Sequence, residues 1–123
     1  MKGLLLSFLS CFVFSGALLV SIPKDTATIL SADGIVVIEF NAAFNKQNSV
    51  DWIENLNDCT TDRVDIAASP NLQAEHKIVV VPTIIVFNEG EEVKRFQANI
   101  MMQIDANKAD VQEAVDEIIM SDF

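Results

Sequence analysis

The chain has 123 residues, enough for one domain of ordinary size and too few for two. Half of its residues are hydrophobic, with only 4 Gly and 3 Pro, which excludes disordered and low-complexity chains. Its net charge of −10 argues against binding to nucleic acid and against a polybasic contact with a membrane. Two Cys and one His are too few for a disulfide scaffold or a multi-histidine metal site, so we expect no cofactor.

The first 22 residues have the pattern of an export signal. Lys2 supplies a positive charge, and residues 4–20 form an apolar run without a charged side chain. As a helix this run spans roughly 26 Å, slightly less than the ~30 Å hydrocarbon core of a bilayer. This pattern is typical of a signal peptide cleaved after Ala17 or nearer Ser21, with an uncleaved membrane anchor as the alternative. Either reading places residues 23–123 outside the cytosol as one periplasmic or secreted domain.

The remaining residues predict alternating strands and helices. After a helical turn over Thr26–Ser31, the β-branched run Ile35–Phe40 is typical of a strand covered on both faces. Val50, Ile53 and Leu56 have helical spacing, and Asn48 with Asp51 resembles a capping box, so we predict a helix over Ser49–Asp58. The later predictions are a strand over 63–67, a helix over 71–76, an interrupted strand over 79–87, a turn at 88–91, a strand over 92–96 and a helix over 108–120.

This order, together with several local motifs, resembles thioredoxin. The motifs are Ala32-Asp33-Gly34 before the first strand, Asn41–Phe44 after it, Ile78–Thr83 around Pro82, and the turn at 88–91. The resemblance implies an α/β thioredoxin fold, in which a central mixed sheet of four to five strands is flanked by helices. The N-terminal hydrophobic signal or anchor helix would precede this fold, whose first strand could begin at Leu18. The resemblance also implies a cis peptide bond between Val81 and Pro82.

The sequence departs from the family where the family's chemistry takes place. The resemblance puts the Cys-x-x-Cys motif at Asn45, Lys46, Gln47 and Asn48, and neither end of this segment is a cysteine. Dithiol exchange needs an activated thiolate and a second thiol that resolves the mixed disulfide. An asparagine amide supplies neither, so we expect a protein that is not an enzyme.

The resemblance then implies a non-catalytic binding or assembly module. The family's groove would hold a protein or an extended peptide between the degenerate motif and the loop before Pro82. The residues expected around it are Phe44, Asn45, Lys46, Val80, Val81 and Pro82, with Trp52 as a further candidate. Two alternatives remain: a single-thiol redox protein that uses Cys59, and an accessory subunit of an envelope complex anchored through residues 4–20.

Three further side chains and one short segment have a predicted environment. Cys59 is expected to be partly buried at the end of the second predicted helix. Glu39 is expected to be buried, to have a pKa raised by desolvation, and to pair with Lys46 or Lys77 if it pairs at all. His76 is expected to have a structural or surface role. Ile100–Met102 is expected to pack against the C-terminal helix, with a docking surface as the alternative.

Overall fold

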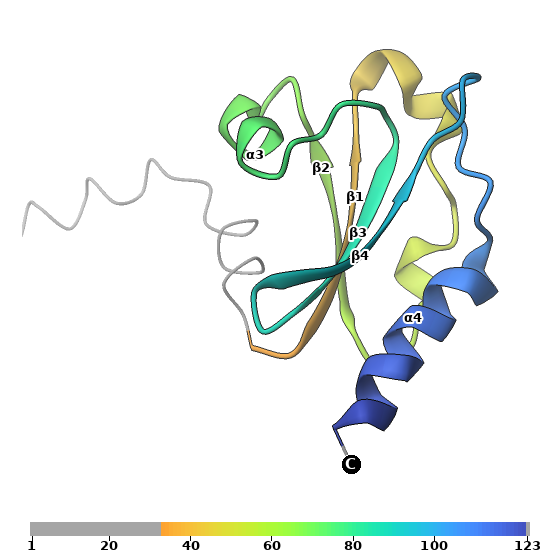
Figure 1. Cartoon of the computed structure of the whole chain (residues 1–123). Helices are drawn as coiled ribbons and strands as arrows, with labels where there is room; N and C mark the ends of the chain where they lie inside the picture. Colours follow the sequence, from red (N-terminus) through yellow and green to blue (C-terminus); the bar gives the residue numbers. More distant parts are fainter. Residues whose placement is uncertain (1–32, 123) are drawn as a thin grey trace, which may run out of the picture.

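The computed structural model describes residues 33–122 of the chain (Figure 1). The predicted leader, including its apolar run at 4–20, and the predicted turn at Thr26–Ser31 lie outside the described residues. Within the described part, none of the helices has the length and hydropathy needed to cross a membrane.

Four strands form one mixed sheet in the described part of the chain. They are β1 (Ile35–Asn41), β2 (Thr60–Asp65), β3 (Thr83–Asn88) and β4 (Glu91–Gln97), arranged in the order β2-β1-β3-β4. β2 runs parallel to β1, whereas β3 is antiparallel to both β1 and β4. The predicted mixed sheet is confirmed with these four strands.

Alternate side chains of β1 supply two separate cores, because successive residues of a strand point to opposite faces of the sheet. On one face, Val37 packs with the C-terminal helix α4 (Lys108–Ser121). On the other face, Val36, Ile38 and Phe40 belong to a second cluster, against which Leu72 of the short helix α3 (Pro70–Glu75) packs. Burial on both faces explains why β1 reads as an unbroken apolar run.

The helix predicted over Ser49–Asp58 is wrong. The chain instead forms two 3-10 helices, η2 (Ala43–Asn48) and η3 (Ile53–Asn55), and Asn48 ends the first of them rather than capping an α-helix. Val50, Ile53 and Leu56 are spaced by three, which matches the 3.0 residues per turn of a 3-10 helix as well as it matches an α-helix. The segment is also rich in Asn, Asp and Ser, which are weak helix formers.

The remaining predictions are confirmed with small shifts of their bounds. α3 and α4 lie within one residue of the predicted helices, and α4 begins with a capping box between Asn107 and Asp110. The hairpin turns at Glu89 and Gly90, which both have positive φ, as a two-residue primed turn requires. β2 starts at Thr60, earlier than predicted, and residues 79–81 are not part of β3.

Candidate functional site

Three loops meet at one end of the sheet. The pairing of the strands places Phe40 of β1 beside Thr83 of β3, and Thr83 beside Gln97 of β4. The segment after β1, the segment before β3 and the segment after β4 therefore lie together at the upper end of the sheet in Figure 1. The candidate site is built from these segments, which are far apart in the sequence.

Exposed apolar side chains gather on these loops. Phe44 is 70% exposed, Val79 77% and Ile100 96%, and Val80 and Met101 are also exposed. We call these five residues the apolar surface. A pocket of about 350 Å³ is lined by four of them together with Ile66, Gln73, Ile78, Val81, Asn99 and Met102. Patches of this kind mark contact sites more often than isolated apolar side chains do.

The packing expected for Ile100–Met102 is therefore wrong. Met102 packs against the core cluster on the side of the sheet opposite α4, while Ile100 and Met101 face solvent. Asn99 holds this loop, because its side-chain oxygen accepts hydrogen bonds from the backbone N–H groups of Met101 (2.8 Å) and Gln103 (3.2 Å). The loop thus presents two apolar side chains on an organised backbone.

The same three loops lack acidic residues. Residues 42–50, 76–83 and 97–104 contain no Asp or Glu, and their charged side chains are Lys46 and Lys77. The whole chain has 18 Asp and Glu against 8 Lys and Arg, so these three loops differ in charge from the chain as a whole. The pocket itself is lined by uncharged residues. The nearest carboxylate along the chain, Asp105, accepts a hydrogen bond from the side chain of Asn99 (2.8 Å) and is not one of the lining residues.

The structure separates the predicted binding residues into two groups. Phe44, Lys46 and Val80 are exposed, as a direct contact requires, and so is Gln47. Asn45, Val81 and Pro82 are buried, so they lie beneath the surface rather than on it. Trp52 is only half-buried but packs against the core on the α4 side. The predicted cis peptide bond between Val81 and Pro82 is confirmed.

The backbone of Val79–Val81 is partly free. Among residues 33–122, nothing accepts a hydrogen bond from the backbone N–H groups of Val79, Val80 or Val81. The carbonyl oxygen of Val80 accepts a hydrogen bond from the Thr83 hydroxyl (2.7 Å), and that of Val81 accepts one from the Asn45 amide (3.4 Å). Within residues 33–122, the N–H groups of the exposed Val79 and Val80 thus have no acceptor.

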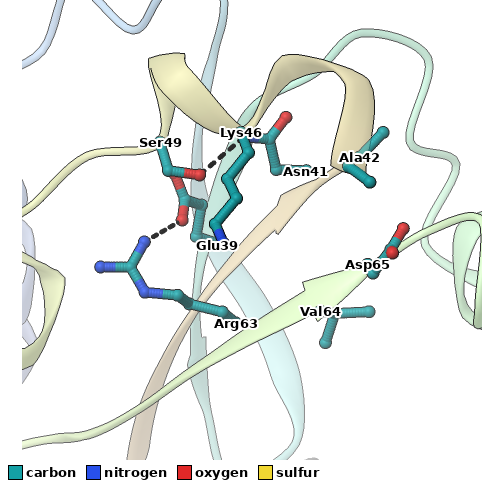
Figure 2. Close-up of a pocket in the computed structure, with 9 residues that line it drawn as sticks. Glu39, Asn41, Ala42, Lys46, Ser49, Arg63, Val64 and Asp65 are labelled. Atoms are coloured by element: carbon teal, nitrogen blue, oxygen red, sulfur yellow. Dashed lines mark hydrogen bonds and ion pairs between the residues drawn. The ribbon is translucent and has the colours of Figure 1, made fainter.

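An ion pair between the buried Glu39 and the half-buried Arg63 lies on another side of this end (Figure 2). Glu39 is only 1% exposed and pairs with Arg63 of β2, not with Lys46 or Lys77 as predicted. The second carboxylate oxygen of Glu39 accepts a hydrogen bond from the Val50 N–H group (2.9 Å), while Arg63 donates to the Val50 carbonyl (2.8 Å). Arg63 also binds Glu54. Both backbone groups of Val50 are thus bound by side chains from the sheet.

Burial raises the pKa of Glu39, as predicted. The Val50 N–H group and the guanidinium of Arg63 act in the opposite direction on this pKa, and burial outweighs them. The pKa of Glu54 is lowered by its hydrogen bonds from Arg63, but Glu54 is largely exposed, so this pair contributes little to stability. Arg63 could not be predicted as the partner of Glu39, because its role depends on the register of β2 against β1.

Cys59 and His76 are both partly buried. Cys59 lies just before β2 and packs against the core on the α4 side, and burial together with Asp58 raises the pKa of its thiol to about 11. The His76 ring lies between the rings of Phe40 and Phe87, at centroid distances of 5.7 and 5.3 Å. In residues 33–122, no three metal-ligating side chains are placed to hold an ion. Within this region, Cys59 and His76 therefore do not belong to a metal-binding cluster.

Solved structures share this fold. No protein-family model and no curated protein matches the chain. A thioredoxin variant from Halobacterium salinarum matches with TM-score 0.60 and 16% identity, over 78% of this chain and 84% of that one. Thioredoxin from Fasciola hepatica matches with TM-score 0.56 and 16% identity, over 76% and 89%. At these identities the similarity shows the fold alone: the chain has a thioredoxin-like α/β fold.

Replacing Arg63 with Met should strongly destabilise the domain. The change leaves Glu39 without its counter-charge and the Val50 carbonyl without its donor, so we expect a loss of about 3 kcal/mol in the free energy of unfolding near pH 7. Urea titration measures this loss. Lys108→Met removes the same charge from an exposed position at the start of α4 and is the control. A loss below about 1 kcal/mol, typical of an exposed ion pair, would contradict the assigned role.

The stability of the domain should also depend on the ionisation of Glu39. Because its pKa is raised, the folded chain keeps a proton over a pH range in which the unfolded chain has released it. Glu39 therefore contributes most below its ordinary pKa of 4.5, and the contribution declines as the pH rises through the raised value. Urea titrations at several pH values should show the difference between the native chain and Glu39→Gln falling as pH rises. A constant or growing difference would refute this sign.

Proposed function

We propose that the chain is a redox-inactive, thioredoxin-like binding module that docks an extended, apolar segment of a protein partner on the apolar surface. The observation that carries the proposal is the gathering of exposed apolar side chains on three loops that contain no Asp or Glu, in an otherwise acidic chain. Such patches are uncommon on surfaces without a partner, and aromatic anchors such as Phe44 contribute much of the energy of contacts.

The absence of suitable thiols supports a non-catalytic role. The chain has only two cysteines, Cys11 and Cys59, and they are too far apart in sequence to form a Cys-x-x-Cys motif. Asn45 and Asn48 lie in η2 at the end of β1, where their amides bind each other. An amide has no ionisable group that could attack a disulfide. We therefore propose that the protein is not an enzyme and uses no cofactor.

The free backbone groups favour an extended partner. A peptide in β conformation would accept a hydrogen bond from the N–H group of an exposed residue of this segment, Val79 or Val80, and place alternate side chains against the surface. The pocket beside Phe44 and Ile100 would receive one of these side chains. Because every lining residue is uncharged, we expect that side chain to be apolar.

The two alternatives have less support. A redox role for Cys59 requires a thiolate, whereas a thiol with a pKa of about 11 is protonated at neutral pH. An envelope subunit anchored through residues 4–20 is compatible with the docking proposal, and N-terminal sequencing of the native protein tests whether that segment is retained. We propose export to the periplasm or the cell exterior on the same N-terminal pattern.

The chain should show no disulfide reductase activity. In an insulin turbidity assay with dithiothreitol, precipitation should proceed at the uncatalysed rate, because no dithiol is available to exchange. Insulin with dithiothreitol alone is the control. Acceleration well above that rate would mean that the proposal of redox inactivity is wrong.

Replacing Phe44 with Ala should weaken docking with little effect on stability. As a probe we choose a fluorescein-labelled heptapeptide with Val, Ile and Val at its second, fourth and sixth positions and Ser elsewhere. Its binding to the full chain is followed by fluorescence anisotropy. The change should weaken the free energy of binding by about 1–2 kcal/mol. The melting temperature should barely change, because Phe44 is largely exposed.

Val93→Ala is the matched control for this experiment. Val93 is 51% exposed on β4 and is not part of the apolar surface, so its removal should leave affinity unchanged. If Phe44→Ala unfolds the domain, Phe44 is a core residue and the surface is misplaced. If it leaves affinity unchanged, the partner binds elsewhere, and the acidic face of α4 becomes the next candidate.

A further inference from the structure

The apolar surface has two walls that no regular secondary structure holds. One wall is the segment 79–82 before β3, and the other is the segment 99–102 after β4. Segments outside helices and sheets must satisfy their backbone groups in other ways. Here one side chain from a third segment, Asn45 of η2, binds a backbone carbonyl in each wall.

The side-chain amide of Asn45 connects the two walls. Its nitrogen donates to the carbonyl of Val81 (3.4 Å), to the carbonyl of Met102 (3.2 Å) and to the side-chain oxygen of Asn41 (3.2 Å). Two N–H bonds thus serve three acceptors. Asn45 is 2% exposed, so water cannot replace these bonds. Met102 also has a φ of 60°, a conformation that a methionine adopts only when its surroundings hold it there.

Asn48 determines which way this amide points. Its side-chain nitrogen donates to the side-chain oxygen of Asn45 (2.8 Å), the shortest bond that the Asn45 amide makes. With the oxygen of Asn45 turned toward Asn48, the nitrogen faces Val81 and Met102. Asn48 itself is only partly buried at the end of η2, so it can be changed with less disturbance than Asn45.

We propose that Asn45 is a positioning residue that fixes the two walls of the apolar surface relative to each other, and that Asn48 sets its orientation. The consequence for docking rests on the proposed function, whereas the order of the walls can be measured without a partner. A surface whose walls are fixed in advance binds an extended segment with a smaller loss of conformational entropy.

The variant Asn48→Asp tests the orientation directly. A carboxylate at this position accepts hydrogen bonds but donates none, so it favours rotation of the Asn45 amide. The rotation turns the oxygen of Asn45 toward the carbonyl oxygens of Val81 and Met102 and the side-chain oxygen of Asn41, and all three bonds are lost. Asn55→Asp introduces the same charge at an exposed residue of η3 and is the matched control. Asn45→Ala removes the amide itself.

Amide hydrogen exchange, followed by NMR on the full chain, measures the order of the loop. The reporters are the N–H groups of Met101 and Met102, which donate to the side chain and the backbone of Asn99. The reference is the N–H group of Glu89, in the turn between β3 and β4 and far from the apolar surface. It donates to the carbonyl oxygen of Gly34. In Asn48→Asp we expect the reporters to exchange about tenfold faster relative to the reference. In Asn55→Asp we expect no change.

Binding of the Val-Ile-Val heptapeptide gives the second readout. The dissociation constant should rise about tenfold in Asn48→Asp and in Asn45→Ala, and stay unchanged in Asn55→Asp. Reporter exchange that is unchanged in both Asn48→Asp and Asn45→Ala would overturn the proposal. Equal acceleration at the reference would also overturn it, because the amide would then support the whole domain. Failure of the native chain to bind the peptide would count against the proposed function alone, and exchange would still decide the role of Asn45.

Discussion

The path of the chain between β1 and β2 depends on one buried carboxylate, Glu39. Glu39 binds the N–H group of Val50 and pairs with Arg63, and Arg63 in turn binds the carbonyl of Val50. With both backbone groups of Val50 bound to the sheet, this segment cannot continue η2 as an α-helix. η2 therefore stays short and ends at Asn48, which leaves Asn45 beneath the two walls of the apolar surface. The ion pair of Glu39 with Arg63 and the candidate docking site are linked through this segment.

Local patterns predicted most of the fold. The apolar run of β1, the Glu89-Gly90 hairpin and the stripe of α4 each carry their own signal, because burial on both faces, positive φ and helical period are properties of neighbouring residues. The segment after Asn48 could not be predicted in this way. A spacing of three fits two kinds of helix, and the contact that separates them comes from Arg63, which is distant in the sequence.

The exposure of some side chains of the candidate site could be predicted from the sequence, and that of others could not. The resemblance to thioredoxin led to the loops after β1 and before β3, and Phe44 is exposed there as expected. Ile100 and Met101 were expected to pack against the C-terminal helix, with a docking surface only as the alternative, because an apolar pair after a strand has the same composition whether it is buried or exposed. The resemblance also put Asn45 on the surface, since the sequence does not say which way a side chain in a short 3-10 helix points. The lack of Asp and Glu in all three loops was a signal available in the sequence.

The central claim is that a partner segment docks on the apolar surface. Mapping ¹H–¹⁵N chemical shift changes on the full chain during titration with the Val-Ile-Val heptapeptide tests this claim most directly. The account predicts saturable shifts concentrated at the amides of Phe44, residues 79–81 and residues 99–102, with β4 and α4 unaffected beyond their ends nearest the loops. Shifts concentrated on the acidic face of α4, or no shifts at saturating peptide, would contradict it.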